Sequence, residues 1–336
     1  MKRQERQRLG NYWMIELLGR GGFADVYLGE HKSLRTLAAI KVLNGRPTRE
    51  KQERFWTEAS ITANLPHRHI VQVFDFDEAS SSPFLVMEYA PNGSLEARHR
   101  GERLPLATIV SYVKQISEAL DYAHRRGVIH CDVKPNNILL DANYDVLLSD
   151  FGIAVTTGSY APILRIFGGT ATYMAPEQYL GRPLPASDQY SLGIMVYEWL
   201  SGHPPFSGSS SEIAMQHVHV SPPPLRRAAP RTPHAVQRVV LRALEKDPAE
   251  RFSSVGSFAL ALERAYQEEE DKLTPVPSRR YQQISRPPHA PVLQRSNDPR
   301  QRALARQRRL RGVPPQPLFA SGHDTPPARY LSRRER

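Results

Sequence analysis

The alternation of apolar and polar positions divides the first 270 residues into a region of strands followed by a region of helices. Short apolar runs, separated by polar or glycine-rich turns, fill most of the first ninety residues. Such runs are typical of strands with one face on a core and the other in solvent. One longer stretch of helix-forming composition interrupts them at 49–65. We expect two strands joined by a turn within 11–30, and further strands at 38–43, 70–75 and 83–88.

Longer segments with helical periodicity follow this region. Across 106–126, apolar residues recur at intervals of three and four from Ile109 to Ala123, and Gly127 is a suitable C-terminal cap. This order of elements predicts an α+β fold in which a β-rich part precedes a helical part. Further helices are expected at 187–200, at about 234–244 and at about 255–269.

The sequence offers neither a membrane span nor a disulfide. No apolar run approaches the roughly 20 residues that a membrane-spanning helix needs. The first residues, Met1 to Arg6, are charged and lack the apolar segment of a secretory signal. Cys131 is the one cysteine, so an intramolecular disulfide is impossible. We therefore expect a cytoplasmic protein whose fold rests on its apolar core.

Basic charge gathers in the C-terminal part of the sequence. The net charge is +11, and within 271–336 there are 15 Lys and Arg residues against 4 Asp and Glu residues. This stretch is rich in Pro, Arg and Gln and poor in apolar residues, so we expect a disordered tail after a domain at 1–270. A solvated linker or docking arm is the simplest interpretation. Attraction to nucleic acid or to an anionic surface is a second one, which rests on charge alone.

Two polar motifs in the helical half supply groups that phosphoryl transfer needs. The segment 130–137 reads His-Cys-Asp-Val-Lys-Pro-Asn-Asn, and 150–152 reads Asp-Phe-Gly. Asp132 can position an acceptor hydroxyl and take its proton, while Asn137 and Asp150 can hold Mg²⁺. The two motifs at this spacing resemble the catalytic loop and the metal-binding motif of the eukaryotic-type protein kinases.

The resemblance is nearest to the bacterial Hanks-type serine/threonine protein kinases. It implies a bilobal fold, with a small lobe at about 9–88 and a large lobe at about 91–267, and ATP bound between them. Mg²⁺ is the implied metal ion, and Mn²⁺ could replace it. The implied activity is phosphorylation of Ser and Thr hydroxyls of proteins, including autophosphorylation, with a role in signal transduction.

The resemblance assigns further residues to the reaction. Lys41 would contact the α- and β-phosphates and pair with a helix glutamate. Glu58 fits that place better than Glu53 because of its spacing to the turn that follows the helix. Lys134 would neutralise the transferring phosphate, and Thr170 would contact the catalytic loop, both as in serine/threonine kinases.

A glycine-rich turn at 19–26 joins the first two strands, and its glycines would let backbone N–H groups approach phosphates closely. A dinucleotide-binding turn is the alternative, but such a turn opens a helix, whereas a second strand-like run follows here. The segment 85–95 resembles the hinge between kinase lobes, where the backbone would bind the adenine edge. The residues that would surround the nucleotide are Leu18, Gly19, Gly21, Gly22, Val26, Ala39, Lys41, Met87, Glu88, Ala90 and Leu139.

Other positions provide checks on this interpretation. Glu177 closes the activation segment, 150–177, and is expected to pair with Arg251. Asp188 should accept hydrogen bonds from the catalytic-loop backbone, cap its own helix, or do both. Cys131 stands where most regulated kinases carry an arginine that binds a phosphorylated activation segment. We therefore expect activity that does not strictly depend on phosphorylation of that segment.

A catalytically weak, nucleotide-binding pseudokinase scaffold is the alternative function. The sequence disfavours it, because a degenerate scaffold should have lost at least one of the groups that carry the chemistry. All of them are present, namely Lys41, Asp132, Asn137 and Asp150.

Overall fold

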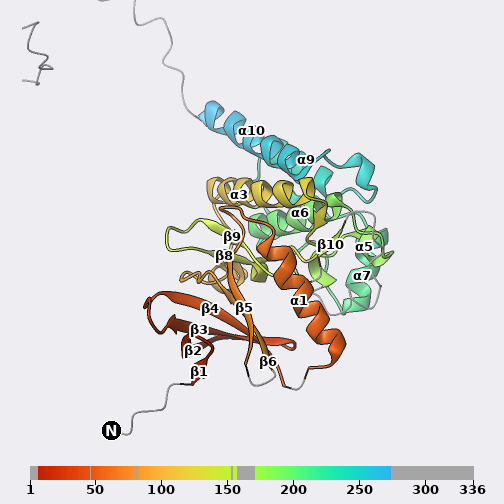
Figure 1. Cartoon of the computed structure of the whole chain (residues 1–336). Helices are drawn as coiled ribbons and strands as arrows, with labels where there is room; N and C mark the ends of the chain where they lie inside the picture. The colour runs from red at the N-terminus through yellow and green to blue at the C-terminus, as the bar shows by residue number, and fades with distance from the viewer. Residues whose placement is uncertain (1–6, 46, 80–81, 153, 157–170, 274–336) are drawn as a thin grey trace, which may run out of the picture. The chain divides into compact units, whose positions relative to one another are not determined.

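The computed structural model describes residues 7–45, 47–79, 82–152, 154–156 and 171–273. Within this part of the chain, a lobe built on a β-sheet (red to orange in Figure 1) precedes a lobe built mainly of helices (yellow to blue). The predicted α+β, bilobal fold is therefore confirmed. Thr170 and the basic tail from 274 onward lie outside the described residues.

The small lobe contains an antiparallel sheet of six strands in the order β1-β2-β3-β4-β6-β5. The predicted glycine-rich turn lies between β2 and β3, and the register of β3 with β4 sets Val26 opposite Lys41. The strands are β1 (Arg8–Leu9), β2 (Tyr12–Arg20), β3 (Ala24–His31), β4 (Leu37–Leu43), β5 (Val73–Ala79) and β6 (Ser82–Met87).

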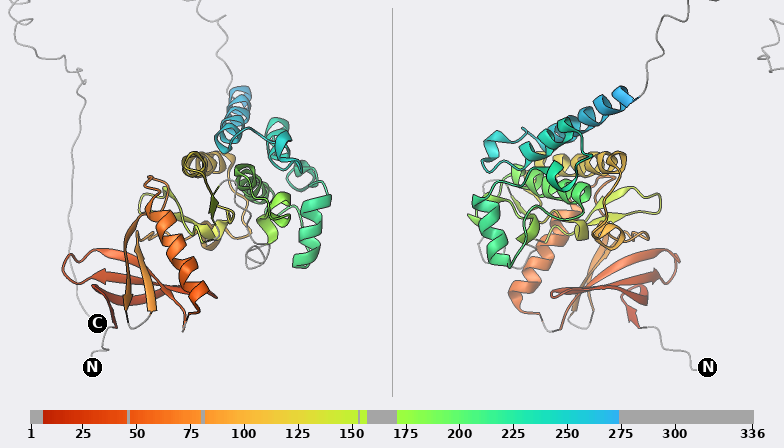
Figure 2. Two further views of the ribbon diagram at one scale, coloured as in Figure 1. Left: turned by 45° about the vertical axis from the view of Figure 1, so that its right-hand side comes forward. Right: turned by 180° about the vertical axis from the view of Figure 1, so that it is seen from behind.

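Helix α1 (Arg49–Ala63) lies against this sheet (Figure 2). The hydroxyl of Thr48 caps its start by accepting from the N–H of Lys51. Phe55 is buried on the helix face that meets the sheet, where its ring packs against Phe23 and Phe76. This packing fixes the rotation of α1 about its axis, which decides the direction in which Glu58 points.

The helical lobe centres on α6 (Pro185–Ser201), which is buried on all sides from Ser187 to Tyr197. A helix of this kind belongs in a core, and α3 (Leu106–Arg125), α9 (His234–Ala243) and α10 (Val255–Leu273) pack around it. The other elements are α2 (Leu95–His99), β7 (Val128–Ile129), η1 (Pro135–Asn137), β8 (Ile138–Leu140), β9 (Val146–Leu148), β10 (Val155–Thr156), η2 (Ala171–Tyr173), α5 (Pro176–Tyr179), α7 (Ser210–His219), α8 (Leu225–Ala228) and η3 (Pro248–Glu250).

The strand predicted at 70–75 differs from the structure, because β5 begins only at Val73 and runs to Ala79. Ile70 and Val71 are buried for another reason. Ile70 forms a β-bridge with Leu148 of β9, and the N–H of Val71 donates to the carbonyl of Leu148 at 3.0 Å. The apolar run therefore spans the join between the lobes before the strand begins. The short helices α2, α7 and α8 were not predicted.

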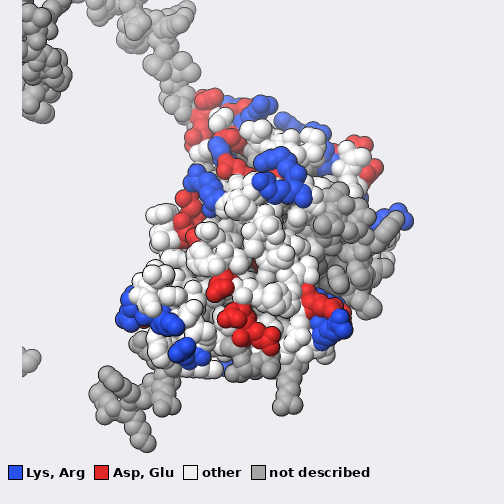
Figure 3. Space-filling model, viewed as in Figure 1, with Lys and Arg blue, Asp and Glu red and all other residues white. Residues whose placement is uncertain are grey.

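Among the residues that the structure describes, none of the helices combines the length and the apolar composition of a membrane span. Basic and acidic side chains are interspersed on the face drawn in Figure 3. This mixture agrees with the even balance of charge in the sequence before the basic tail.

Candidate active site

A buried aspartate in the first turn of α6 binds the backbone of the catalytic loop, 130–137. The carboxylate of Asp188 accepts from the backbone N–H groups of His130 and Cys131, each at 2.9 Å, and lies 2.7 Å from Nε2 of His124. Burial by itself would raise the pKa of Asp188, but these partners hold it below its ordinary value. The predicted contact of Asp188 with the loop backbone is therefore confirmed.

His130 links the catalytic loop to the Asp-Phe-Gly motif. Its Nδ1 accepts from the N–H of Asp132 at 3.2 Å, so the ring proton sits on Nε2, which donates to the carbonyl of Ser149 at 3.0 Å. The ring also packs against Phe151, with centroids 4.6 Å apart. The positions of Asp132 and of the motif are thus coupled through one side chain.

Two residues here hold left-handed backbone conformations although neither is glycine. The angle φ is +65° at Cys131 and +63° at Asp150. Such conformations cost on the order of 1–3 kcal/mol each and persist where the surroundings enforce them, most often at functional sites. The hydrogen bonds around the loop therefore stabilise a strained backbone conformation.

Asp132, Lys134 and Asn137 form one polar cluster. Nζ of Lys134 lies 2.8 Å from Oδ2 of Asp132. Nδ2 of Asn137 donates to the backbone carbonyl of Asp132 at 2.9 Å and to its Oδ2 at 3.0 Å. Burial raises the pKa of the Asp132 carboxyl, and the Lys134 ammonium opposes this rise. A carboxylate held in this way can accept a proton from a bound hydroxyl.

Lys41 of β4 stands between two carboxylates from different elements. Its Nζ lies 2.5 Å from Oε1 of Glu58 on α1 and 3.2 Å from Oδ1 of Asp150. Burial by itself would lower the pKa of Lys41, but the two carboxylates hold it above its ordinary value. Glu53, the rival candidate, forms an exposed ion pair with Arg49 at 2.9 Å. The structure thus brings Glu58, and not Glu53, to the lysine.

The residues predicted to surround a nucleotide come from the strands of the small lobe, the segment after β6 and strand β8. Ala39 and Met87 are partners across β4 and β6. Leu139 of β8 forms a β-bridge with Ser94, near the end of the hinge segment. The side chains of Met87 and Leu139 are half-buried. Leu18 and Gly19 lie near the end of β2, Gly21 and Gly22 in the turn, Val26 in β3, and Glu88 and Ala90 after β6.

Sequence reasoning missed Asn44, which follows β4 and holds the glycine-rich turn. Its Nδ2 donates to the carbonyl of Gly21 at 2.8 Å, and its backbone N–H donates to the carbonyl of Phe23 at 3.0 Å. Gly21 in turn donates to the carbonyl of Ala24, and a Cβ added at Gly21 would lie 2.7 Å from that oxygen. The turn is therefore closed on itself, and no periodicity or motif marks the asparagine that holds it.

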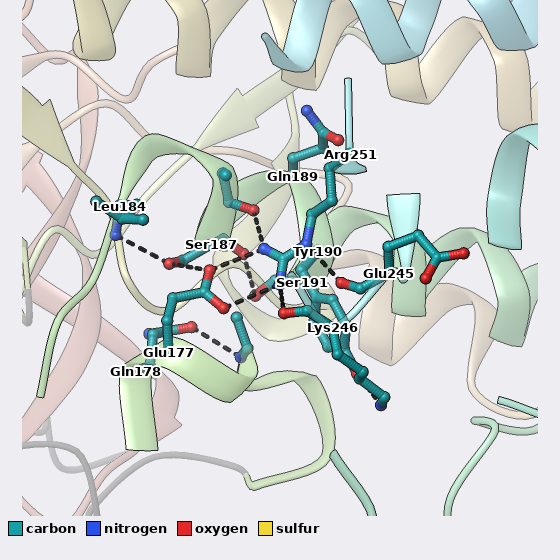
Figure 4. Close-up of polar contacts among 12 residues, drawn as sticks. Glu177, Gln178, Leu184, Ser187, Gln189, Tyr190, Ser191, Glu245, Lys246 and Arg251 are labelled. Atoms are coloured by element: carbon teal, nitrogen blue, oxygen red, sulfur yellow. Dashed lines mark hydrogen bonds and ion pairs between the residues drawn. The ribbon is translucent and has the colours of Figure 1, made fainter. Parts of the chain in front are cut away.

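A buried ion pair anchors α5, at the end of the activation segment (Figure 4). Nη1 and Nη2 of Arg251 lie 2.8 and 2.9 Å from the two carboxylate oxygens of Glu177. The guanidinium also donates to the carbonyls of Ala186, Glu245 and Lys246, so each of its five N–H groups can have an acceptor. The predicted pairing of Glu177 with Arg251 is confirmed.

Comparison with known proteins agrees with this geometry. The family described as "Protein kinase domain" matches residues 12–266. Serine/threonine-protein kinase Pkn1 of Myxococcus xanthus is 38% identical over 273 residues, which cover 78% of this chain and 39% of that protein. PknB of Mycolicibacterium smegmatis is 38% identical over 269 residues, covering 76% and 43%. PknA of Mycobacterium tuberculosis is 38% identical over 265 residues, covering 75% and 61%.

The chain therefore matches between about two fifths and three fifths of the length of these curated relatives. The family match, by contrast, extends over most of the chain and includes both lobes. With the catalytic loop, the lysine–glutamate pair and the Asp-Phe-Gly motif gathered in one site, this match shows that the chain belongs to the protein kinase family, with bacterial serine/threonine-protein kinases among its relatives.

Proposed function

We propose that this chain is a serine/threonine protein kinase, which transfers the γ-phosphoryl group of ATP to Ser and Thr hydroxyls of proteins, itself included. The observation that carries the proposal is that one site contains two polar clusters. The first consists of Lys41, Glu58 and Asp150, and the second consists of Asp132 and Lys134 in the catalytic loop. The names of the relatives support the same activity.

Each cluster has its own task in this proposal. Lys41 would bind the α- and β-phosphates, and Glu58 would keep its ammonium in place. Asp132 would orient the acceptor hydroxyl and take its proton, while Lys134 would offset charge on the transferring group. The proposal also includes the predicted contact of Thr170 with the catalytic loop.

Asn137 and Asp150 would hold a divalent metal ion, with Mg²⁺ as the first candidate and Mn²⁺ as the second. Both residues offer hard oxygen atoms, which suit these ions. Because Nδ2 of Asn137 is bonded to Asp132, its Oδ1 is the atom left for a metal. The described residues contain no group of three His, Cys, Asp or Glu side chains that could hold a metal ion, so nucleotide phosphates would complete the coordination. When bound, the ion would neutralise charge on those phosphates.

Intact mass tests the proposal most directly. The full chain and its Asp132→Asn variant are incubated with Mg-ATP, with and without a protein rich in Ser and Thr as acceptor. We expect mass gains of about 80 Da per phosphate, on the chain itself or on the acceptor, in the reactions of the full chain and not in those of Asp132→Asn. Both proteins should still show ATP-dependent thermal stabilisation, because Asp132 is not assigned to nucleotide binding.

The same experiment separates the kinase from a pseudokinase scaffold. A scaffold would be stabilised by ATP, yet neither the chain nor the acceptor would gain mass. That result would overturn the proposed transfer activity while leaving nucleotide binding in place.

We also propose a domain boundary near residue 270, a cytoplasmic location and a role in signal transduction. Helix α10 extends to Leu273, so a truncation that respects the fold should remove 274–336. Binding of the full and truncated chains to DNA, RNA and anionic vesicles at low salt tests the second interpretation of the tail. Equal binding by both chains would exclude it.

A further inference from the structure

A buried glutamine connects the catalytic loop to the segment that ends at α5. Gln178 is the third residue of α5 and is 2% exposed. Its Nε2 donates to the backbone carbonyl of Cys131 at 2.8 Å, and its Oε1 accepts from the N–H of Ala175 at 2.9 Å. A carbonyl on one side and an N–H on the other determine the orientation of the amide. Both polar atoms of the amide therefore have a hydrogen-bond partner.

The peptide that Gln178 holds is the one that joins Cys131 to Asp132. Cys131 has φ at +65°, so the loop is strained at this residue. Its N–H is fixed from the α6 side by Asp188 at 2.9 Å, and its carbonyl is fixed from the α5 side by Gln178. Rotation of either peptide group would carry the carboxylate of Asp132 with it.

The other end of the connection is firmly attached to the helical lobe. The hydroxyl of Tyr179 donates to the carbonyl of Ala171 at 3.0 Å, and that of Tyr173 donates to Glu198 at 2.7 Å. Met174 packs in one apolar cluster with Ile129, which lies just before the catalytic loop. Gln178 therefore ties the loop to a segment, 171–175, that has further contacts of its own with the helical lobe.

On the function proposed above, we infer that Gln178 is a positioning residue for Asp132. Cys131 cannot bind a phosphate as an arginine would. The amide of Gln178 supplies instead a neutral connection between the end of the activation segment and the catalytic loop. Because this connection contains no phosphate, it does not itself require phosphorylation of the segment.

Isosteric substitution separates the two hydrogen bonds of Gln178. Gln178→Glu keeps an acceptor for the N–H of Ala175 but turns a carboxylate oxygen toward the carbonyl of Cys131 in place of a donor. Gln189→Glu is the matched control. Gln189 is also fully buried, but its amide bonds backbone groups of Phe252 and Ser254 instead of the catalytic loop.

Steady-state phosphorylation of a peptide is measured for the three proteins. We expect kcat of Gln178→Glu to fall between tenfold and a hundredfold, since displacement of a reacting group by about 1 Å can cost a factor of about 10². The KM for ATP should stay within about twofold, because Gln178 lies in the helical lobe and not among the phosphate-binding groups. Gln189→Glu should lose stability without this split between kcat and KM.

Hydrogen exchange of the backbone amides at 129–134 provides a readout that needs no activity. Exchange should be faster in Gln178→Glu than in the unchanged chain, and unchanged in Gln189→Glu. Equal kcat and equal exchange in Gln178→Glu and the unchanged chain would overturn the inference. An unchanged chain without transfer activity would overturn the proposed function instead, and the exchange data would still decide whether Gln178 holds the loop.

Discussion

Protonation of a buried histidine should make the stability of this protein fall in mild acid. His217 lies at the end of α7 with no exposed surface. Its Nδ1 accepts from the hydroxyl of Tyr190 at 2.9 Å, and its Nε2–H donates to the carbonyl of Thr172 at 2.9 Å. Lys246 donates to the same hydroxyl at 3.3 Å and to the carbonyl of His217 at 2.7 Å. A second ring proton on Nδ1 would stop this nitrogen from accepting the hydroxyl proton of Tyr190, and it would add a cation beside the ammonium.

The size of the effect follows from the pKa of His217. Burial, assisted by the Lys246 ammonium, lowers this pKa from its ordinary value of 6.5 to about 4. In the unfolded chain the imidazole takes up a proton near its ordinary pKa, whereas in the folded chain it does so only near the lowered one. The folded state is therefore favoured fully above the ordinary pKa, and this advantage is lost as the pH falls toward the lowered one. Between pH 7.5 and pH 5.0, linkage gives a loss of about 2 kcal/mol in the free energy of unfolding.

Urea unfolding at these two pH values measures the loss, with the fluorescence of buried Trp199 as the signal. The comparison is between the unchanged chain and His217→Gln, whose amide can still donate to Thr172. Other groups titrate alike in both proteins, so their effects cancel in the difference. We expect the variant to lose about 2 kcal/mol less than the unchanged chain between the two conditions. His219→Gln, which changes an exposed histidine on the same helix, should behave as the unchanged chain does.

The reasoning would be refuted by one clear result. If His217→Gln lost as much stability as the unchanged chain over this range, the imidazole would not be held neutral by its surroundings. The hydrogen bonds to Tyr190 and Thr172 would then not depend on its protonation state.

Two further predictions concern other buried or positioning contacts. Arg251→Met leaves the carboxylate of Glu177 buried without its cation and should lower the free energy of unfolding by about 3–5 kcal/mol in urea. A loss below about 1 kcal/mol would contradict this, and Glu177→Met in the same chain should recover part of it. Asn44→Ala releases the carbonyl of Gly21, so more ATP should be needed to reach the same thermal stabilisation. Asn64→Ala, which removes an amide that donates to the carbonyl of Ser60 in α1, should leave that ATP dependence unchanged.

In the sequence, side-chain periodicity predicts most of the elements, because it records which faces are buried, and the resemblance of the motifs to those of protein kinases implies the two lobes. It also identified the residues that meet in the site. Few functions other than phosphoryl transfer explain Asp132, Asn137 and Asp150 at this spacing. The structure brings these residues together with Lys41. Even the distant pair of Glu177 with Arg251 could be predicted, because the resemblance places both residues at motif positions that pair in kinases.

Tertiary structure alone decided how these residues are held. The run at 70–75 looked like a strand because it is apolar, but its first residues are buried by a contact between the lobes. Asn44, Gln178 and His217 were not predicted as positioning residues, since each bonds backbone carbonyl groups. The physical reason is that every residue except proline carries the same backbone N–H and C=O groups. A side chain that binds them has no complementary residue type in the sequence, and only the folded chain shows which carbonyl it meets.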